Sequence, residues 1–376
     1  MNGLIPFNVP YVPQRSQRYV MESINSEHLH GDGEYTQKAS RIIKELVGGG
    51  SVLLTPSCTH ALEMASMLAG IGPGDEVILP SYTFPSAATA VTKFGGIPVF
   101  VDIDAKSKFI DLEQVKSAIN KKTKAISWVN YAGVTGDIKD LIEIAHNNHL
   151  LLIEDNAHGL GGVHELGNLG SFGDFSVLSF HGTKNVQCGE GGALVINNSD
   201  YFDRAEIIRE KGTDRRRFIR GEVQKYQWVD LGSSYLLAEP LAAMLLGQLE
   251  EFDSIQESRK QIWGVYYKAL KDKEVLEIPN LYLTELENVA HMFYFEVKNP
   301  SLRNQILDES ERRGIKINAH YQPLHNSKAG MKFGRAQYTY ENSIMTSRNL
   351  LRLPLYRDLQ ESQAQEVIAI IQELKF

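Results

Sequence analysis

Short apolar runs alternate with helix-like stretches between about residues 50 and 200. The runs are nearly continuous and do not alternate with polar residues, which is typical of strands buried on both faces of a sheet. We predict strands over residues 77–80, 98–101, 125–129, 150–153, 175–180 and 192–196, and helices over 86–93 and 138–146. Helices between such strands indicate a parallel or mixed sheet in an α/β architecture.

The pattern changes after about residue 238. One long helix is predicted over residues 238–270, with a break near Asp253. A second unit begins near residue 271, and we expect it to be a smaller α/β domain. Its predicted elements are a strand over 293–297, a helix over 302–313, a short apolar segment at 315–317, and helices near 344–350 and 361–374.

Composition and charge favour a soluble enzyme. The 376 residues carry 39 basic and 46 acidic side chains, and the net charge of −7 disfavours a protein that coats nucleic acid. No apolar run approaches the ~20 residues that span a bilayer, and the first residues do not resemble a signal peptide. Two cysteines, Cys58 and Cys188, cannot make a disulfide framework. We expect a cytoplasmic enzyme with neither a nucleic-acid nor a membrane partner.

The segment S-F-H-G-T-K at residues 179–184, followed by G-E-G-G at 189–192, holds the first candidate for chemistry. Lys184 lies just past a predicted strand, where ligand pockets open in α/β sheets. Partial desolvation there favours the neutral amine that a Schiff base needs. On position alone, a surface lysine in a loop remains the alternative.

The second candidate is E-D-N-A-H at residues 154–158, directly after a strand of four aliphatic residues. An acidic pair at this position is costly unless Asp155 has a charged or hydrogen-bonding partner. A buried carboxylate can keep the ring nitrogen of pyridoxal phosphate protonated. Binding of Mg²⁺ and capping of the next helix are equally open alternatives.

Two further segments follow predicted strands or open helices. T-P-S-C-T-H-A-L at residues 55–62 offers free backbone N–H groups that could hold a phosphate, although a plain N-cap by Ser57 or Thr59 explains it as well. Phe84, in S-Y-T-F at 81–84, could lie flat on a planar cofactor or belong to the core. The four candidates follow separate strands, so they could meet at one sheet edge, and together they provide what pyridoxal phosphate requires.

These motifs, in this order, resemble the DegT/DnrJ/EryC1 family of sugar aminotransferases, which are fold type I pyridoxal-phosphate enzymes acting on nucleotide-linked keto sugars. The resemblance runs from Ile5 to Leu355. It implies a large domain with a mostly parallel seven-stranded sheet over residues 31–260, a small C-terminal α/β domain over 261–376, and an N-terminal arm over 1–30 near the active site. It also implies a homodimer whose active sites are shared between subunits.

The resemblance assigns roles to the candidate residues. Lys184 is expected to bind the cofactor covalently and later to move the proton, while Asp155 faces the pyridine nitrogen. His158 is expected near the phenolic oxygen or the ring, and Phe84 is expected to stack on the ring. The residues expected to bind the phosphate are Ser57, Cys58, Thr59 and Ser179. Ser234 replaces an asparagine that, in many family members, reaches the phosphate of the partner subunit's cofactor.

The resemblance also indicates which residues face the substrate. The segment H-Y-Q-P-L-H at residues 320–325 is similar to a family loop that faces the substrate. The residues expected at the mouth of the site are Phe7, Gly31, Tyr35, His320, Tyr321 and His325. Stretches at 31–33, 54–59, 208–213, 232–235 and 291–294 are similar to the branch of dTDP-4-amino-4,6-dideoxygalactose transaminases.

That branch implies transfer of an amino group from L-glutamate to C4 of dTDP-4-keto-6-deoxy-D-glucose, for a surface polysaccharide such as an O-antigen or enterobacterial common antigen. The alternatives are the 4-amino-4,6-dideoxyglucose epimer and amination at C3. A pyridoxal-phosphate sugar dehydratase is disfavoured because those relatives typically replace the lysine with histidine. A non-catalytic nucleotide-sugar binder is the last alternative.

The remaining motifs do not indicate another cofactor or a metal site. G-L-G-G at residues 159–162 does not match a dinucleotide-binding turn, and His146 and His149 lie at a polar helix end without a third ligand, so no metal site is expected. A cluster of arginines could be a solvated charge run, or could approach a diphosphate or a partner subunit. Its members are Arg215, Arg216, Arg217 and Arg220.

Overall fold

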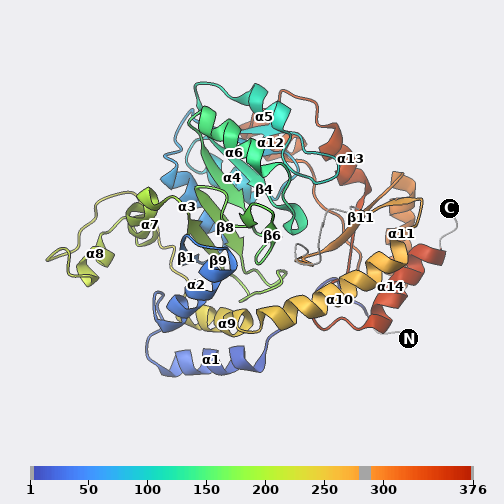
Figure 1. Ribbon diagram of the computed structural model, residues 1–376, viewed down its shortest axis with the longest axis horizontal. Helices are drawn as coiled ribbons and strands as arrows, with labels where there is room; N and C mark the ends of the chain where they lie inside the picture. Colours follow the sequence, from blue (N-terminus) through green and yellow to red (C-terminus); the bar gives the residue numbers. More distant parts are fainter. Residues whose placement is uncertain (1–3, 279–288, 374–376) are drawn as a thin grey trace.

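The computed structural model describes residues 4–278 and 289–373, and its centre is a seven-stranded sheet (Figure 1). The strand order is β1-β9-β8-β5-β4-β2-β3. The strands are β1 (Ser51–Thr55), β2 (Glu76–Pro80), β3 (Ile97–Val101), β4 (Thr123–Val129), β5 (Leu151–Asp155), β8 (Phe175–Ser179) and β9 (Gly192–Ile196). Strand β9 is antiparallel to both of its neighbours, and every other neighbouring pair is parallel. The mostly parallel seven-stranded sheet is confirmed.

Helices cover both faces of this sheet because successive side chains of a strand point to opposite sides. In β2, Val77 and Leu79 pack into the core beneath α3, α4 and α7, whereas Ile78 packs beneath α5 and α6. Helices α2 and α9 cover the end of the sheet formed by β1, β9 and β8. The helices of this domain are α2 (Glu34–Leu46), α3 (Cys58–Leu68), α4 (Ser86–Thr92), α5 (Leu112–Ala118), α6 (Ile138–Asn147), α7 (Phe202–Arg209), α8 (Arg215–Ile219) and α9 (Glu239–Leu249).

The predicted long helix is two helices, α9 and α10 (Phe252–Leu270), with the break at Glu250 and Glu251. Helix α10 runs out of the large domain into the small one (Figure 1). The small-domain sheet is antiparallel, with the order β10-β11-β12, and its core also encloses Ile5 from the N-terminal segment. The elements of the small domain are β10 (Leu276–Glu277), β11 (Phe293–Val297), β12 (Leu350–Leu353), α11 (Pro300–Arg312), α13 (Glu341–Asn349) and α14 (Glu361–Glu373). Helix α12 (Lys328–Phe333) lies beside the large domain, because Arg335, just after it, bridges Val99 of β3 (Figure 1).

The apolar segment at 315–317 is not a strand of this sheet; Ile315 instead makes a single parallel bridge with Ile5. We also did not predict α1 (Gln14–Asn25), which packs on α9, or α2 and β1. A hairpin of two short strands, β6 (Val163–His164) and β7 (Gly167–Asn168), and 3-10 turns at Tyr131–Gly133, Ser199–Tyr201 and Leu324–Asn326 complete the described elements.

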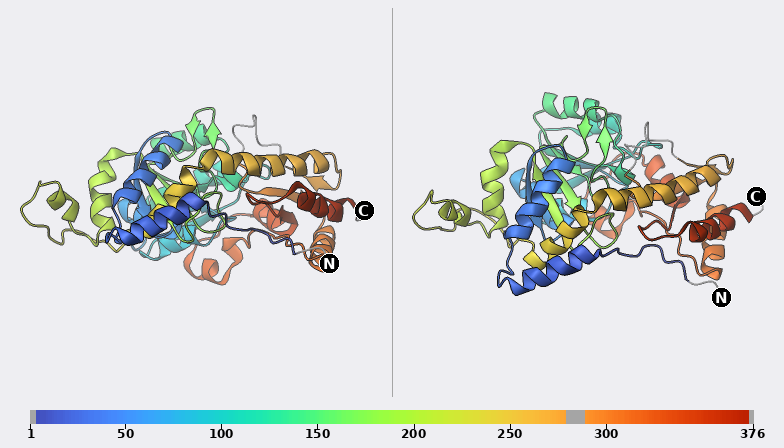
Figure 2. Two further views of the ribbon diagram at one scale, coloured as in Figure 1. Left: turned by 90° about the horizontal axis from the view of Figure 1, so that it is seen from below. Right: turned by 60° about the horizontal axis from the view of Figure 1, so that its bottom comes forward.

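The segment 214–231, which includes α8, projects from the body of the protein in every view (Figures 1 and 2). It carries apolar side chains that face solvent in the single chain, among them Trp228 (77% exposed), Leu231 (66%) and Ile219 (54%). Within the described residues, no helix is both long and apolar enough to cross a membrane.

The carboxylate of Glu154 organises the loop after β7. Its side chain is completely buried, and its two oxygens accept hydrogen bonds from the Gly170 N–H (2.7 Å), the Phe172 N–H (3.1 Å), the Gly173 N–H (3.4 Å) and the amide of Asn130 (2.8 Å). Burial raises the pKa of Glu154, while these donors oppose that shift. Four donors without a basic side chain are what stabilise this buried anion.

Replacing Glu154 with alanine should therefore destabilise the fold by about 3–5 kcal/mol, because three buried backbone N–H groups and one amide lose their acceptor. Urea unfolding at fixed protein concentration measures the change. Glu165→Ala, at an exposed position of the neighbouring hairpin, is the control and should change stability by less than about 0.5 kcal/mol. Equal stability of the two variants would contradict this role.

Candidate active site

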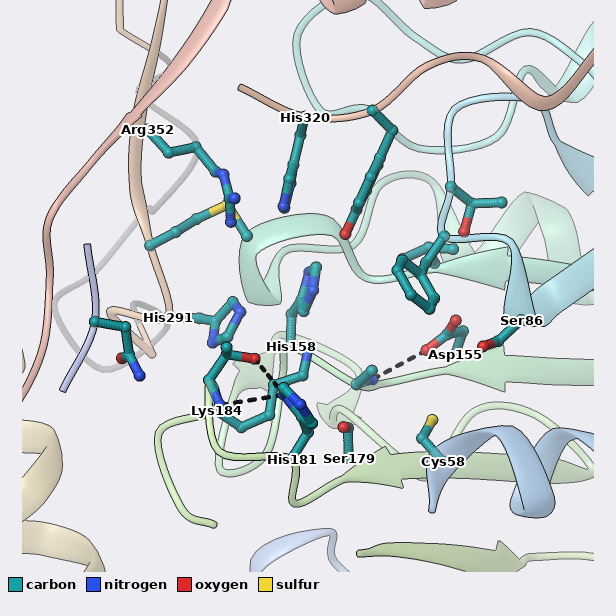
Figure 3. Close-up of a pocket in the computed structure, with 18 of the residues that line it drawn as sticks. Cys58, Ser86, Asp155, His158, Ser179, His181, Lys184, His291, His320 and Arg352 are labelled. Atoms are coloured by element: carbon teal, nitrogen blue, oxygen red, sulfur yellow. Dashed lines mark hydrogen bonds between the residues drawn. The ribbon is translucent and has the colours of Figure 1, made fainter. Parts of the chain in front are cut away.

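A cavity of about 560 Å³ opens at the carboxyl ends of the parallel strands, between the two domains. The turns after β2, β5 and β8 and the start of α3 form its large-domain side. Residues around His291, His320 and Arg352 form its small-domain side (Figure 3). The convergence predicted from the four sequence segments is therefore present in the structure.

Lys184 lies between β8 and β9 and lines this cavity. Burial lowers the pKa of its amine to about 8, against the opposing influence of Cys58 and Asp155. With this pKa, about a tenth of the amines are neutral at pH 7, far more than for an ordinary lysine, which suits a nucleophile and a proton carrier. The loop-surface alternative is excluded by this position.

Asp155 is the last residue of β5, and its side chain points toward the cavity on the opposite side of the strand from Glu154 (Figure 3). One carboxylate oxygen accepts a hydrogen bond from the Ala157 N–H (3.1 Å). Burial raises the pKa of Asp155, opposed by that hydrogen bond and by the charge of Lys184. The second oxygen has no hydrogen-bond partner among the described residues, so the site offers an acceptor to a protonated ring nitrogen.

The first turn of α3 forms a cradle of free backbone N–H groups. The Ser57 hydroxyl caps the helix by accepting the His60 N–H (3.2 Å), which leaves the N–H groups of Cys58 and Thr59 without an intrahelical acceptor. The start of β9 approaches so closely that a Cβ on Gly192 would lie 2.4 Å from the Cys58 nitrogen. Such an N-terminus attracts an anion through its N–H groups and its dipole.

Hydroxyl groups complete this cradle. Thr59 and Ser86 are hydrogen-bonded to each other (2.7 Å), and Ser179, at the end of β8, lines the same wall. Burial raises the pKa of Cys58 well above its ordinary value, so its side chain is a neutral thiol at neutral pH. The N-cap by Ser57 is confirmed, and it leaves two N–H groups available, so phosphate binding here stays a prediction.

Two neutral histidines stack beside Lys184. The rings of His158 and His291 are 4.3 Å apart and nearly parallel, and burial lowers the pKa of both well below the ordinary value. Nδ1 of His158 accepts the Ala132 N–H (3.4 Å), which assigns its proton to Nε2. Thus Nε2 of His158 is a donor, as the predicted place beside a phenolic oxygen requires.

The tautomer of His291 follows from Asn185. The Asn185 amide nitrogen donates to Gln256 and to the Val289 carbonyl, each at 2.7 Å, so its oxygen is the acceptor for Nδ1–H of His291 at 3.0 Å. The backbone of His291 is held from behind by Arg259, whose guanidinium donates to the carbonyls of Ala290 and His291. Nε2 of His291 is consequently an unprotonated acceptor.

Aromatic side chains form the opposite wall. Tyr321 stacks on His320 at 3.9 Å, and Phe84 meets the edge of Tyr321 at 6.2 Å. Phe84 is 58% exposed although it lines the cavity, so its ring face is available to a planar ligand. Phe7 also lines the cavity. The core alternative for Phe84 is wrong.

Four candidate residues do not line this cavity in the single chain. Gly31 packs against the Leu237 carbonyl, and the Tyr35 hydroxyl donates to Glu22 of α1. His325 is hydrogen-bonded to the Ser81 hydroxyl (2.6 Å) behind the cavity wall, and Ser234 is exposed. The expectation that they act at a site shared by two subunits stays a prediction.

The arginines of the cluster form ion pairs with nearby carboxylates. Arg216 pairs with Asp32 (2.6 Å) and Arg215 pairs with Glu210 (3.0 Å). Arg220 joins Glu206 and Glu222, both at 2.5 Å. These ion pairs attach the projecting segment to the body of the protein, and none of the four arginines lines the cavity.

Sequence reasoning gave no role to several cavity residues, three of which (Thr83, His181 and Glu190) lie within the four candidate segments and five of which lie outside them. They are Asn8, Thr83, Ser86, His181, Glu190, His291, Asn318 and Arg352. The sequence could have pointed to Arg352, because this charged residue lies within an apolar run formed by Leu350, Leu351 and Leu353. The position of His291, directly before a predicted strand, was a weaker indication of a functional role.

Comparison with protein families agrees with this geometry. The family model described as DegT/DnrJ/EryC1/StrS aminotransferase matches residues 10–372. The chain belongs to this family. Its sequence is 28% identical, over 99% of this chain and 97% of the relative, to the spore coat polysaccharide biosynthesis protein SpsC of Bacillus subtilis.

Solved structures of aminotransferases match the whole fold. TlmJ from Streptoalloteichus hindustanus, an aminotransferase, is 26% identical with a TM-score of 0.90, covering 99% of this chain and 98% of that one. The PMP form of the putative sugar aminotransferase Spr1654 from Streptococcus pneumoniae is 25% identical with a TM-score of 0.90, covering 98% of both chains. The protein is thus a fold type I aminotransferase of the DegT/DnrJ/EryC1/StrS family, and its cofactor is pyridoxal phosphate.

The cavity residues fit this cofactor. Lys184 offers an amine of lowered pKa, Asp155 an unpaired oxygen for the ring nitrogen, and the start of α3 two unpaired N–H groups for the phosphate. Each of these groups lacks a partner within the described chain that would compete with the cofactor.

The lowered pKa of Lys184 has a measurable consequence. In the cofactor-free protein, labelling of Lys184 by an amine-directed reagent should rise with pH and reach half its maximum near pH 8, because only the neutral amine reacts. Peptide mass spectrometry quantifies the label, and Lys184→Arg identifies the peptide. A midpoint at the ordinary lysine value of about 10.4 would contradict the burial effect.

Proposed function

We propose that this aminotransferase transfers the amino group of L-glutamate to a nucleotide-linked keto sugar. The observation that carries the proposal is the single cavity in which Lys184, Asp155 and the start of α3 meet a wall of uncharged hydrogen-bonding side chains. His158, His291 and Tyr321 in that wall are neutral near pH 7, since burial lowers the pKa of the histidines and raises that of the tyrosine. Neutral donors and acceptors suit the hydroxyl groups of a sugar.

The relatives support a sugar substrate. Spr1654 is described as a putative sugar aminotransferase, and SpsC as a protein of spore coat polysaccharide biosynthesis. Within that class we propose dTDP-4-keto-6-deoxy-D-glucose as acceptor and dTDP-4-amino-4,6-dideoxy-D-galactose as product, for a surface polysaccharide. The support for this choice is the likeness of the stretches 31–33, 54–59 and 291–294 to that branch of the family.

The residues of the chain would divide the chemistry as follows. Pyridoxal phosphate supplies an aldehyde that takes up the amino group and a ring that stores electrons when a C–H bond breaks. Asp155 holds a proton at the ring nitrogen, and the start of α3 neutralises the phosphate. Lys184 removes the proton from the donor carbon at its Nζ and later returns one to the sugar carbon. Nε2–H of His158 donates to the phenolic oxygen.

We further propose that two chains share the active sites. The support is that the segment 214–231 projects from the body (Figures 1 and 2) and exposes the apolar side chains of Trp228, Leu231 and Ile219, which a second copy would cover. Ser234 lies opposite Glu210 in an isolated antiparallel bridge at the base of this segment, where the Lys211 N–H donates to the Ser233 carbonyl. In a dimer this base would bring Ser234 toward the partner's phosphate cradle.

Substitution of the two central residues tests the chemical roles. Lys184→Ala should abolish turnover and prevent covalent retention of the cofactor after borohydride treatment, measured as added mass. Asp155→Asn should lower kcat by at least about 100-fold while the circular dichroism spectrum is retained, because the ring proton loses its anionic partner. Asp140→Asn, exposed on α6, is the control. Full activity in either site variant would remove that residue from its role.

Product analysis tests the substrate. With L-glutamate and dTDP-4-keto-6-deoxy-D-glucose, NMR coupling constants of the product should show an axial amino group at C4, the galacto configuration. An equatorial amino group would indicate the 4-amino-4,6-dideoxyglucose epimer, and an amino group at C3 a different regiochemistry. Loss of a ring hydroxyl without amination would indicate a dehydratase. Binding without any reaction would contradict enzymatic activity on this sugar.

A further inference from the structure

His291 lines the cavity at the end of a strained segment. Ala290, directly before it, has a φ of 44°, a left-handed conformation that a residue with a Cβ rarely adopts. The carbonyls of Ala290 and His291 both accept hydrogen bonds from Arg259, at 3.0 and 2.8 Å. Arg259 is itself buried, which lowers its pKa to about 9. A strained residue and a buried cation are both costly, and here both serve to hold one side chain in a defined place.

The ring of His291 presents an unprotonated nitrogen to the cavity. The Val289 carbonyl can only accept, so the Asn185 group 2.7 Å from it is the amide nitrogen, and the Asn185 oxygen lies 3.0 Å from Nδ1 of His291. Nδ1 carries the one ring proton, because burial and nearby cationic side chains lower the pKa of His291 and keep the ring neutral. Nε2 has a lone pair and no hydrogen-bond partner among the described residues. A ligand in the cavity can therefore donate a hydrogen bond to Nε2.

The neighbours of His291 place this nitrogen beside the reacting groups. Its ring stacks on that of His158 at 4.3 Å, and the ring of His320 lies nearly parallel on the cavity wall, 6.5 Å from His158. Burial is the main cause that lowers the pKa of His158 and His291, and the charge of Lys184 is the next. Figure 3 shows both rings on the side of the cavity where Lys184 lies. A ligand group that reaches Nε2 of His291 is thus close to the carbon on which Lys184 acts.

An unprotonated nitrogen discriminates between the groups that reach it. A carboxylate, a diphosphate and a carbonyl have only lone pairs and cannot donate to Nε2. A hydroxyl can donate, and a keto sugar with a hydroxyl on the carbon next to the carbonyl brings that donor close to the reacting carbon. The fixed tautomer of His291 therefore matches a hydroxyl adjacent to the carbonyl that is aminated.

We propose that His291 determines specificity for the sugar by accepting, at Nε2, a hydrogen bond from the hydroxyl next to the keto carbon. This inference rests on the proposed transfer of an amino group to a keto sugar, and in the proposed substrate the hydroxyl is the one at C3. Asn185 and Arg259 act through His291, since the first fixes its ring proton and the second fixes its backbone. A site that binds a hydroxyl through a buried polar atom rejects an analogue that lacks the hydroxyl.

Binding to the aldehyde form of the holoenzyme isolates this contact, because that form holds no amino group to transfer. By calorimetry, wild-type protein should bind dTDP-4-keto-6-deoxy-D-glucose about tenfold more tightly than its 3-deoxy-3-fluoro analogue, since fluorine does not donate. His291→Phe, which keeps a stacked ring, should bind the sugar about tenfold more weakly and the two ligands equally within about twofold. His291→Gln, whose amide oxygen can replace Nε2, should recover part of the preference.

The control is His146→Phe, the same change at an exposed position of α6, which should leave both affinities unchanged. In His291→Phe the half-reaction with L-glutamate should change less than about threefold, because a carboxylate does not donate to Nε2. Three results would overturn the role of His291: equal binding of the two ligands by wild type, the full preference in the folded His291→Phe variant, or a loss confined to the glutamate half-reaction. Failure of the wild-type holoenzyme to aminate any keto sugar would instead overturn the proposed function.

Discussion

The structure of the active site depends on two adjacent carboxylates at the end of one buried strand. Successive side chains of β5 point to opposite sides, so Glu154 turns into the protein and Asp155 into the cavity. Four hydrogen-bond donors hold Glu154, and these contacts fix the loop at residues 170–173 behind the site. Asp155 keeps one unpaired oxygen. One carboxylate thus stabilises the fold and leaves its neighbour free to act on the cofactor.

Much of this arrangement was accessible from sequence because it depends on local patterns. Continuous apolar runs located β2 to β5, β8 and β9, and the polar residues that end them located Asp155, Lys184 and Phe84. The seven-strand count and the domain plan came from family resemblance. Helix α1 was missed because it is mostly polar and buries only Ser16 and Ser23, so no apolar stripe marks it.

The small-domain side of the cavity could not be derived in the same way. His291 precedes β11 and Arg352 lies in β12, two paired strands whose partners are about sixty positions apart, and no local motif links the two residues. The side chains of the cavity differ in charge. Lys184 and Arg352 are its cations, Asp155 supplies a carboxylate, and the stacked histidines between them are neutral.

Helix α10 has a consequence for how the two domains are positioned. It is about 28 Å long, as 19 residues at the rise of an α-helix require, and it has no break. Its first half lies against the large domain, Arg259 at its middle holds the His291 backbone, and Ile262, Tyr266 and Leu270 belong to the small-domain core. Swinging one domain away from the other would bend this helix or break those contacts. The helix therefore couples the positions of the two domains on either side of the cavity.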